Sequence, residues 1–157
     1  HKRFPSWTRE GDALIFSQVS DDSHTQGLFR LTIASREIST FFDTSAEETQ
    51  PVVSPDGLRV AFVSFPEDTP ESNRDIYVLD LATMEATQMT THPALDWYPW
   101  WGLDSREVYF ISFRQTGNPA LWATSKDDST AQLIVPIVSF NSYYVGLMDA
   151  FLPIANP

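Results

Sequence analysis

The chain has 157 residues, of which 42% are hydrophobic and 13% aromatic, so it carries enough apolar material for a packed domain and is not expected to be disordered. Its 21 acidic and 10 basic side chains give a net charge of -11, which repels phosphate backbones and anionic lipid headgroups and disfavours nucleic acid as a partner. The sequence has no cysteine and no apolar run long enough to span a membrane, which excludes disulfides, thiolate metal sites and a membrane-spanning segment.

Three similar segments organise the sequence. They are led by Pro5, Pro51 and Pro99, which are 46 and 48 residues apart. Repeats of this length are supersecondary units that stack on their neighbours, because one unit cannot bury its apolar face alone. We therefore divide the chain into a lead-in (residues 1–4), three repeats (residues 5–50, 51–98 and 99–135) and a tail (residues 136–157).

The first repeat predicts strands at residues 14–18, 28–32 and 38–42. A turn, Thr8-Arg9-Glu10-Gly11, precedes the first of these strands. Gly11 suits a turn because glycine takes a positive φ angle without steric cost.

The second repeat is the clearest copy. A short strand at residues 52–53 leads into the turn Ser54-Pro55-Asp56-Gly57, and strands follow at residues 58–64, 75–81 and 86–90. Alternation places Val60 and Phe62 on one face of the second strand and Ala61 and Val63 on the other. Because both faces are apolar, we expect this strand to lie between two neighbouring sheets.

The third repeat predicts strands at residues 108–112, 121–124 and 132–135. Phe110 matches Phe16 and Phe62 in the other copies, which supports the alignment. Ser105 stands where the other turns have glycine and should cost on the order of 1 kcal/mol if the backbone is unchanged. We therefore expect the third repeat to be the least stable.

Aromatic residues gather where the second repeat joins the third, in the run Asp96-Trp97-Tyr98-Pro99-Trp100-Trp101. Trp101 occupies the same slot as Trp7 and Val53, so we expect it to pack between repeats. Trp97, Tyr98 and Trp100 are candidate binding residues, because tryptophan and tyrosine combine rigid contact area with a polar group. We interpret Asp96 as a hydrogen-bond acceptor in a turn.

The tail is too apolar to be left in water, so it must pack against something. We interpret it as a docking arm for a partner. Its candidate anchors are Tyr143, Tyr144, Leu147 and Phe151.

The sequence offers no catalytic constellation. It lacks the Gly-x-Ser-x-Gly elbow of serine hydrolases and a glycine-rich phosphate loop, and His1, His24 and His92 share no metal-binding spacing. We therefore predict a non-enzymatic protein with no cofactor and no metal site.

The repeat, with its Ser-Pro-Asp-Gly turn, its apolar strand and the segment Asp75-Ile76-Tyr77-Val78-Leu79-Asp80-Leu81, resembles the TolB-like (WD-type) β-propeller repeat family over residues 5 to about 135. The resemblance implies an all-β fold whose blades are four-stranded antiparallel sheets around a channel. It also implies closed rings of about four to eight blades. Three blades cannot close such a ring, which leaves three alternatives. Two copies of this chain pair into a six-bladed ring, another protein subunit covers the open blade faces, or the sequence is a piece of a longer protein.

Function is less determined than fold, because similar propellers occur in periplasmic Tol-Pal proteins, in sensor ectodomains and as lids on serine peptidases. The interpretation we prefer is a protein-binding or scaffold subunit of a larger, extracytoplasmic (periplasmic or secreted) assembly. The alternatives are the lid of a serine peptidase or related hydrolase, and a small-ligand sensor that stacks its ligand on Trp97, Tyr98 and Trp100.

Overall fold

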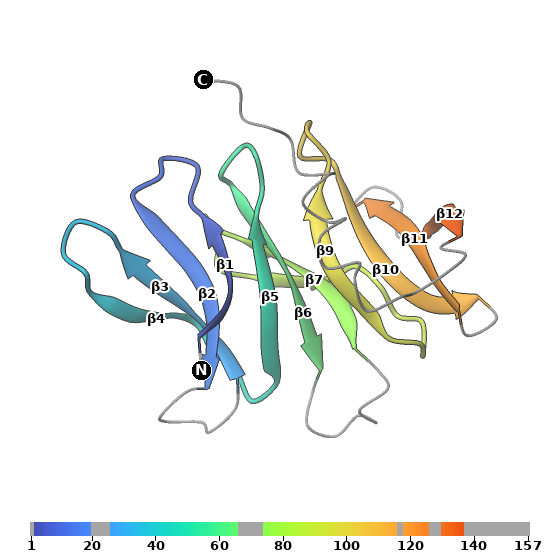
Figure 1. Cartoon of the computed structure of the whole chain (residues 1–157), viewed down its shortest axis with the longest axis horizontal. Helices are drawn as coiled ribbons and strands as arrows, with labels where there is room; N and C mark the ends of the chain where they lie inside the picture. The colour runs from blue at the N-terminus through green and yellow to red at the C-terminus, as the bar shows by residue number, and fades with distance from the viewer. Residues whose placement is uncertain (1, 20–25, 66–73, 116–117, 126–129, 137–157) are drawn as a thin grey trace.

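The computed structural model describes residues 2–19, 26–65, 74–115, 118–125 and 130–136, which form twelve β-strands (Figure 1). These described residues contain no helix that could cross a membrane. The strands form three four-stranded antiparallel sheets, each in simple chain order. We call these sheets blade 1, blade 2 and blade 3. The predicted all-β class, with three four-stranded antiparallel blades that leave a ring unclosed, is confirmed.

Each blade uses consecutive strands. Blade 1 contains β1 (Arg3–Trp7), β2 (Ala13–Val19), β3 (Gln26–Thr32) and β4 (Ile38–Phe42). Blade 2 contains β5 (Glu47–Val53), β6 (Arg59–Phe65), β7 (Asp75–Asp80) and β8 (Ala86–Gln88). Blade 3 contains β9 (Asp96–Trp101), β10 (Glu107–Gln115), β11 (Asn118–Ser125) and β12 (Gln132–Pro136).

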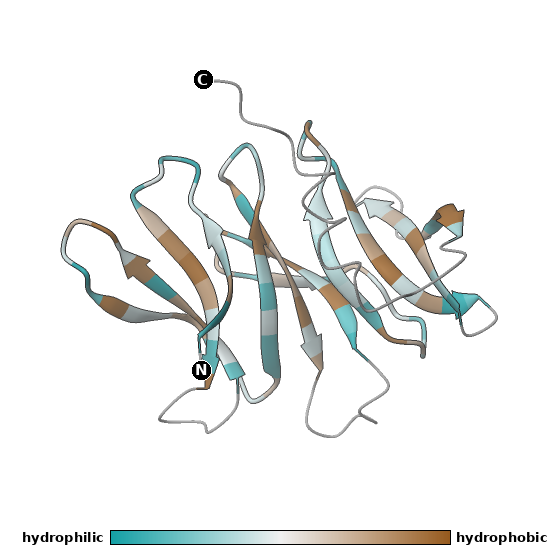
Figure 2. Ribbon diagram, in the orientation of Figure 1, coloured by the Kyte–Doolittle hydropathy of each residue, from teal (hydrophilic) through white to brown (hydrophobic). Residues whose placement is uncertain are grey.

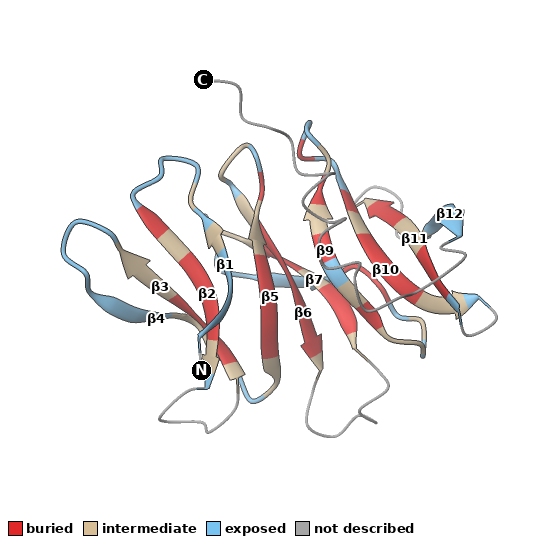
Figure 3. Ribbon diagram, in the orientation of Figure 1, coloured by how far each residue is buried: buried red, intermediate tan, exposed pale blue. Residues whose placement is uncertain are grey.

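The first strands of the blades lie beside one another, with β5 between β1 and β9. The fourth strands lie at the opposite edges of the sheets, where β4, β8 and β12 are mostly exposed (Figure 3). The first strands are therefore the inner strands of the array and the fourth strands are its outer strands.

The inner strands begin ahead of the prolines that lead the sequence repeats. The predicted strand at residues 52–53 is too short, because β5 also includes the polar segment from Glu47 to Gln50, which pairs with β6. Because its side chains are polar, this segment lacks the alternation of apolar residues that predicts a strand. The residue ranges assigned to the repeats stay an interpretation of the sequence.

Two apolar clusters form the core, and each contains buried residues of two adjacent blades. The strands β2, β6 and β10 carry much of this hydrophobic sequence, drawn in brown in Figure 2. Val60 and Phe62 of β6 face blade 1, where they meet Ile15 and Leu28. The alternate residues of β6 face blade 3 and pack with Trp101, Val108 and Phe110. The prediction that β6 is apolar on both faces because it lies between two sheets is confirmed.

The turns that join the first and second strands of the blades, which we call the inner turns, contain a residue with left-handed backbone, as predicted. Gly11 has a φ of 70°, Gly57 of 72° and Ser105 of 61°. Ser105 is buried, and its hydroxyl oxygen accepts a hydrogen bond from the Asp56 N–H at 3.0 Å. The side chain that makes this turn unfavourable thus also connects blade 3 to blade 2, a contact that glycine could not make.

Each inner strand itself contains one left-handed residue, which the sequence did not reveal. These residues are Phe4, Gln50 and Tyr98, with φ angles of 54°, 55° and 51°. Each lies at an irregularity in the pairing between the first and second strands of its blade. Such β-bulges bend a strand and redirect its side chains.

Candidate binding face between blades 2 and 3

The structure separates the three predicted aromatic binding residues into two groups. The rings of Trp97 and Tyr98 lie together, with centroids 6.2 Å apart, and Tyr98 is 39% exposed. Trp100 stacks instead on Tyr109 of β10, at a centroid distance of 6.1 Å and an interplanar angle of 15°. Trp101 is buried between the blades, as predicted.

The bulge of β9 presents Tyr98 to solvent. Its left-handed backbone points the Tyr98 N–H toward blade 2, where the Gln50 side-chain oxygen accepts it at 2.7 Å. Gln50 is itself buried, so its amide is fixed in position. The exposed ring therefore stands on a backbone that the neighbouring blade holds in place, which favours a pre-organised contact surface.

Arg74 joins this aromatic group, although nothing in the sequence pattern singled it out. Its guanidinium carbon lies 4.4 Å from the Phe65 ring centroid and 4.3 Å from that of Trp97, so both rings cover it. The Arg74 carbonyl accepts the Asp96 N–H at 2.9 Å. These contacts connect the end of β6 and the start of β7 to the start of β9 through cation–π attraction and one backbone hydrogen bond.

The interpretation of Asp96 as a turn acceptor is wrong, because the residue lies within β9 and is fully buried. Its carboxylate pairs with Arg114 at 2.7 Å. The Arg114 guanidinium carbon also lies 5.1 Å from the Phe110 ring centroid and 4.8 Å from that of Trp122. Burial raises the pKa of Asp96 against the lowering effect of Ser112 and Arg114.

A second buried carboxylate, Asp75, lies at the start of β7. It accepts hydrogen bonds from the Thr90 hydroxyl at 3.2 Å and from the Gln88 amide at 3.0 Å. Burial raises the pKa of Asp75, and the charge of Asp96 raises it further. The two carboxyl groups are bound by fixed donors in the interior, which suits a structural role at this junction.

Glu48 is the buried carboxylate between blades 1 and 2. It is 1% exposed, and the Thr44 hydroxyl donates a hydrogen bond to it. Burial raises the pKa of Glu48 to about 7, with a smaller contribution from the charge of Asp43, while the Thr44 bonds oppose the shift. Both junctions therefore hold an acidic group whose charge is costly in the interior.

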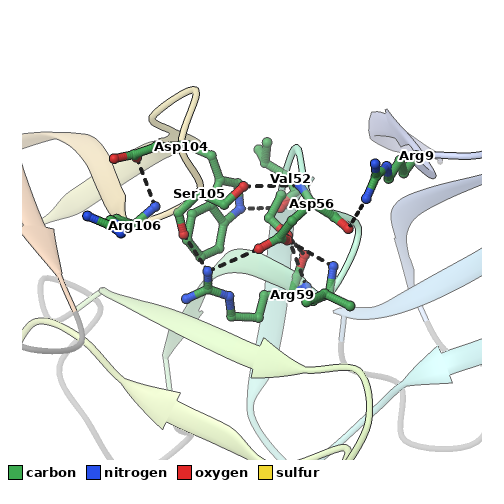
Figure 4. Close-up of polar contacts among 10 residues, drawn as sticks. Arg9, Val52, Asp56, Arg59, Asp104, Ser105 and Arg106 are labelled. Carbon is green, nitrogen blue, oxygen red and sulfur yellow. Dashed lines mark hydrogen bonds and ion pairs between the residues drawn. The ribbon is translucent and has the colours of Figure 1, made fainter.

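The inner turns form a second contact region between the blades (Figure 4). The Arg9 guanidinium donates to the Asp56 carbonyl at 2.9 Å, and the Arg59 guanidinium donates to the Ser105 carbonyl. The Trp101 indole N–H donates to the Val52 carbonyl at 2.9 Å. These bonds link each blade to the next at the end of the inner strands.

A crevice of about 30 Å³ between blades 2 and 3 is lined by Arg59, Met89 and Trp101 among others, which is room for about one water molecule. In the part of the chain that the structure describes, no group of three or more His, Cys, Asp or Glu side chains could hold a metal ion. The predicted tail anchors Tyr143, Tyr144, Leu147 and Phe151 lie outside the described residues.

The geometry defines a class of protein. Three antiparallel sheets of four strands, with their first strands side by side and two apolar clusters between them, are consecutive blades of a β-propeller.

Comparison with known proteins gives the family. A model described as "TolB beta propeller domain" matches residues 4–145. The chain therefore belongs to the TolB β-propeller domain family.

The similar proteins are longer than this chain. The Tol-Pal system protein TolB of Francisella tularensis subsp. holarctica (strain OSU18) is 28% identical over 86 residues, which cover 55% of this chain and 19% of the relative. The crystal structure of TolB from Acinetobacter baumannii superposes with a TM-score of 0.68 at 18% identity, over 85% of this chain and 32% of that one. A puromycin-hydrolyzing peptidase of Mycobacterium tuberculosis has the same fold, with a TM-score of 0.70 at 12% identity, over 87% of this chain and 24% of the peptidase. The chain thus spans about a fifth of the curated relative it matches.

Proposed function

We propose that this chain is a non-catalytic propeller module that binds protein and serves as a scaffold in a larger, extracytoplasmic assembly. The observation that carries the proposal is the unclosed array of blades. Trp7, on the face of blade 1 that turns away from blade 2, is 58% exposed, whereas the equivalent Trp101 is 7% exposed between blades 2 and 3. Exposed apolar surface of this kind marks sites of protein–protein contact.

The aromatic surface around Tyr98 supports the same role. Trp97 and Tyr98 stand beside Arg74 on a backbone fixed by blade 2, and aromatic and arginine side chains are the types that dominate protein interfaces. Membership of a family that includes Tol-Pal system proteins favours a periplasmic or secreted location. The tail, with the anchors named above, would extend the contact as a docking arm.

Affinity purification from a cell-envelope extract tests this proposal. The wild-type chain should retain a protein that the double variant Trp97→Ala/Tyr98→Ala loses. Leu103→Ala is the matched control, because it also removes an exposed apolar side chain from blade 3. A chain shortened after residue 136 should lose assembly or solubility. If the wild type retains no protein, and the shortened chain behaves like the full one, the scaffold role is refuted.

A second function, the lid of a peptidase, is favoured by one observation. The described blades superpose on a peptidase structure as well as on a TolB structure, with TM-scores of 0.70 and 0.68. A hydrolase domain encoded in the same gene would support this alternative, and a gene without one would rule it out. The third possibility, a small-ligand sensor, would require the fluorescence of Trp97 to change when ligand binds.

A further inference from the structure

Arg114 shows how this chain satisfies an arginine that lies over two aromatic rings. Its guanidinium carbon is 5.1 Å from the Phe110 ring centroid and 4.8 Å from that of Trp122. A terminal nitrogen pairs with the Asp96 carboxylate at 2.7 Å, and the Nε–H donates to the Ser112 hydroxyl at 2.9 Å. A phenylalanine, a tryptophan and a carboxylate thus surround one cation.

Arg74 repeats the aromatic half of this arrangement. Its guanidinium carbon lies 4.4 Å from the Phe65 ring centroid and 4.3 Å from that of Trp97, which is again one phenylalanine and one tryptophan. The polar half is missing from the described part of the chain. No ion pair among those residues includes Arg74, and its Nε–H is buried there without a hydrogen-bond acceptor. No described carboxylate therefore neutralises the charge of Arg74.

The stacked rings determine what kind of group can complete the site. Rings that lie over a guanidinium attract its charge through its flat faces, and the N–H donors project from the edge of the plane. A carboxylate fits this edge best, because its two oxygens match the fork of donors and its charge compensates the cation. A neutral acceptor would leave the charge unbalanced beside two apolar rings.

Arg74 differs from Arg114 in being near the surface. The Arg114 side chain is 11% exposed and its partner Asp96 is fully buried, so that ion pair is closed within the blades. Arg74 and Trp97 are both half-buried, and the neighbouring Tyr98 is exposed. A carboxylate of another molecule can therefore approach Arg74.

The backbone around Arg74 is held in place before any partner arrives. Arg74 directly precedes β7, and its carbonyl accepts the Asp96 N–H of β9 at 2.9 Å. The Tyr98 N–H is held in turn by Gln50 of β5. An arginine that is already stacked loses less conformational freedom when it forms an ion pair, which favours binding.

From these contacts we infer that Arg74, stacked on Phe65 and Trp97, binds the carboxylate of an aspartate or glutamate side chain of the protein partner. The terminal nitrogens of Arg74 donate to the carboxylate oxygens, as Arg114 donates to Asp96. The inference rests on the proposed function and deepens it, because it names the chemical group that this surface recognises.

An NMR titration of the full chain with a pair of synthetic peptides tests the inference. Acetyl-Gly-Glu-Gly-amide carries a carboxylate, and acetyl-Gly-Gln-Gly-amide is the same peptide without that charge. The Arg74 Nε–H signal is identified as the guanidinium signal that disappears in Arg74→Lys. It should shift with the glutamate peptide and stay in place with the glutamine peptide.

Variants of the chain give the magnitude, with the backbone amide signal of Tyr98 as the reporter. Arg74→Gln should raise the dissociation constant of the glutamate peptide about ten-fold, because a charge-assisted hydrogen bond is lost. Arg74→Lys keeps the charge but loses the planar fork, so it should restore little of the binding. Arg106→Gln is the matched control, because it removes the same charge from an exposed arginine of blade 3 and should leave the constant unchanged. Circular dichroism checks that each variant is folded.

Three results would overturn the inference. The first is an equal shift of the Arg74 signal with both peptides, and the second is no shift with either peptide up to its solubility limit. The third is a shift that appears only after Glu67, Asp68 and Glu71 are replaced by glutamine, because carboxylates of the chain itself would then occupy Arg74.

Failure of this inference is distinguishable from failure of the proposed function. The affinity purification can still retain a protein that Trp97→Ala/Tyr98→Ala loses, whatever the peptides do. If Arg74→Gln retained that protein as well as the wild type does, the scaffold role would stand and the carboxylate contact would be refuted.

Discussion

Trp7 and Trp101 provide a matched pair of substitutions, because they occupy equivalent positions in different blades. Trp101→Ala removes a side chain that is 7% exposed, together with its hydrogen bond to Val52 and its contact with Arg59. A buried tryptophan truncated to alanine costs about 3–5 kcal/mol, and we expect a loss in that range. Trp7→Ala makes the same change at a side chain that is 58% exposed and should cost about 0.5 kcal/mol.

Urea denaturation followed by far-UV circular dichroism measures both values without relying on tryptophan emission. Trp101→Phe keeps most of the apolar surface but loses the N–H donor, so its stability should fall between that of the wild type and that of Trp101→Ala. This milder variant keeps the test usable if Trp101→Ala does not fold. Equal losses for the substitutions to alanine at positions 7 and 101 would refute the assignment of position 7 to an open blade face.

Three further predictions concern the stability of variants at the junctions between blades. The pKa of Glu48 is raised from 4.5 to about 7 in the folded chain, so its contribution to stability is complete below pH 4.5 and is lost, by about 3 kcal/mol in all, as the pH rises from 4.5 through 7. Glu48→Gln should flatten this part of a stability–pH profile. Ser105→Ala keeps a non-glycine residue in the left-handed position but loses the hydrogen bond to Asp56, so it should be less stable than the wild type by about 1–2 kcal/mol in chemical denaturation. A difference in unfolding free energy near zero would contradict the role of that bond. Arg114→Ala leaves the buried Asp96 carboxylate unpaired and should lower the free energy of unfolding by about 3–5 kcal/mol at neutral pH, with a smaller loss in acid. A loss of stability that does not depend on pH would contradict the ion-pair explanation.

The fold could be predicted because the sequence repeats the physical requirements of one blade three times. Phe16, Phe62 and Phe110 occupy the same position in their strands, and the turn residues Gly11 and Gly57 have the left-handed backbone expected of them. A repeat shows such positions several times, so a chance match in one copy carries little weight.

The contacts between blades could not be predicted in the same way. Arg74 precedes β7 by one position and meets Trp97 of the next blade, a distant pairing that no local pattern encodes. The charged start of β5 and the burial of Asp96 also escaped prediction, because a polar residue in a sequence does not show whether a neighbouring blade covers it. The bulges at Gln50 and Tyr98 depend on backbone geometry that non-glycine residues rarely adopt.

The central proposal is that the chain forms consecutive propeller blades and that a different protein binds the face at Trp7, which is 58% exposed in this structure. The solution mass of the full wild-type chain, measured by light scattering coupled to size exclusion, tests this proposal most directly. The account predicts a single chain of 17.8 kDa whose mass does not change with Trp7→Ala. A stable particle of two chains that Trp7→Ala converts to single chains would contradict it, because the chain would then close its own ring.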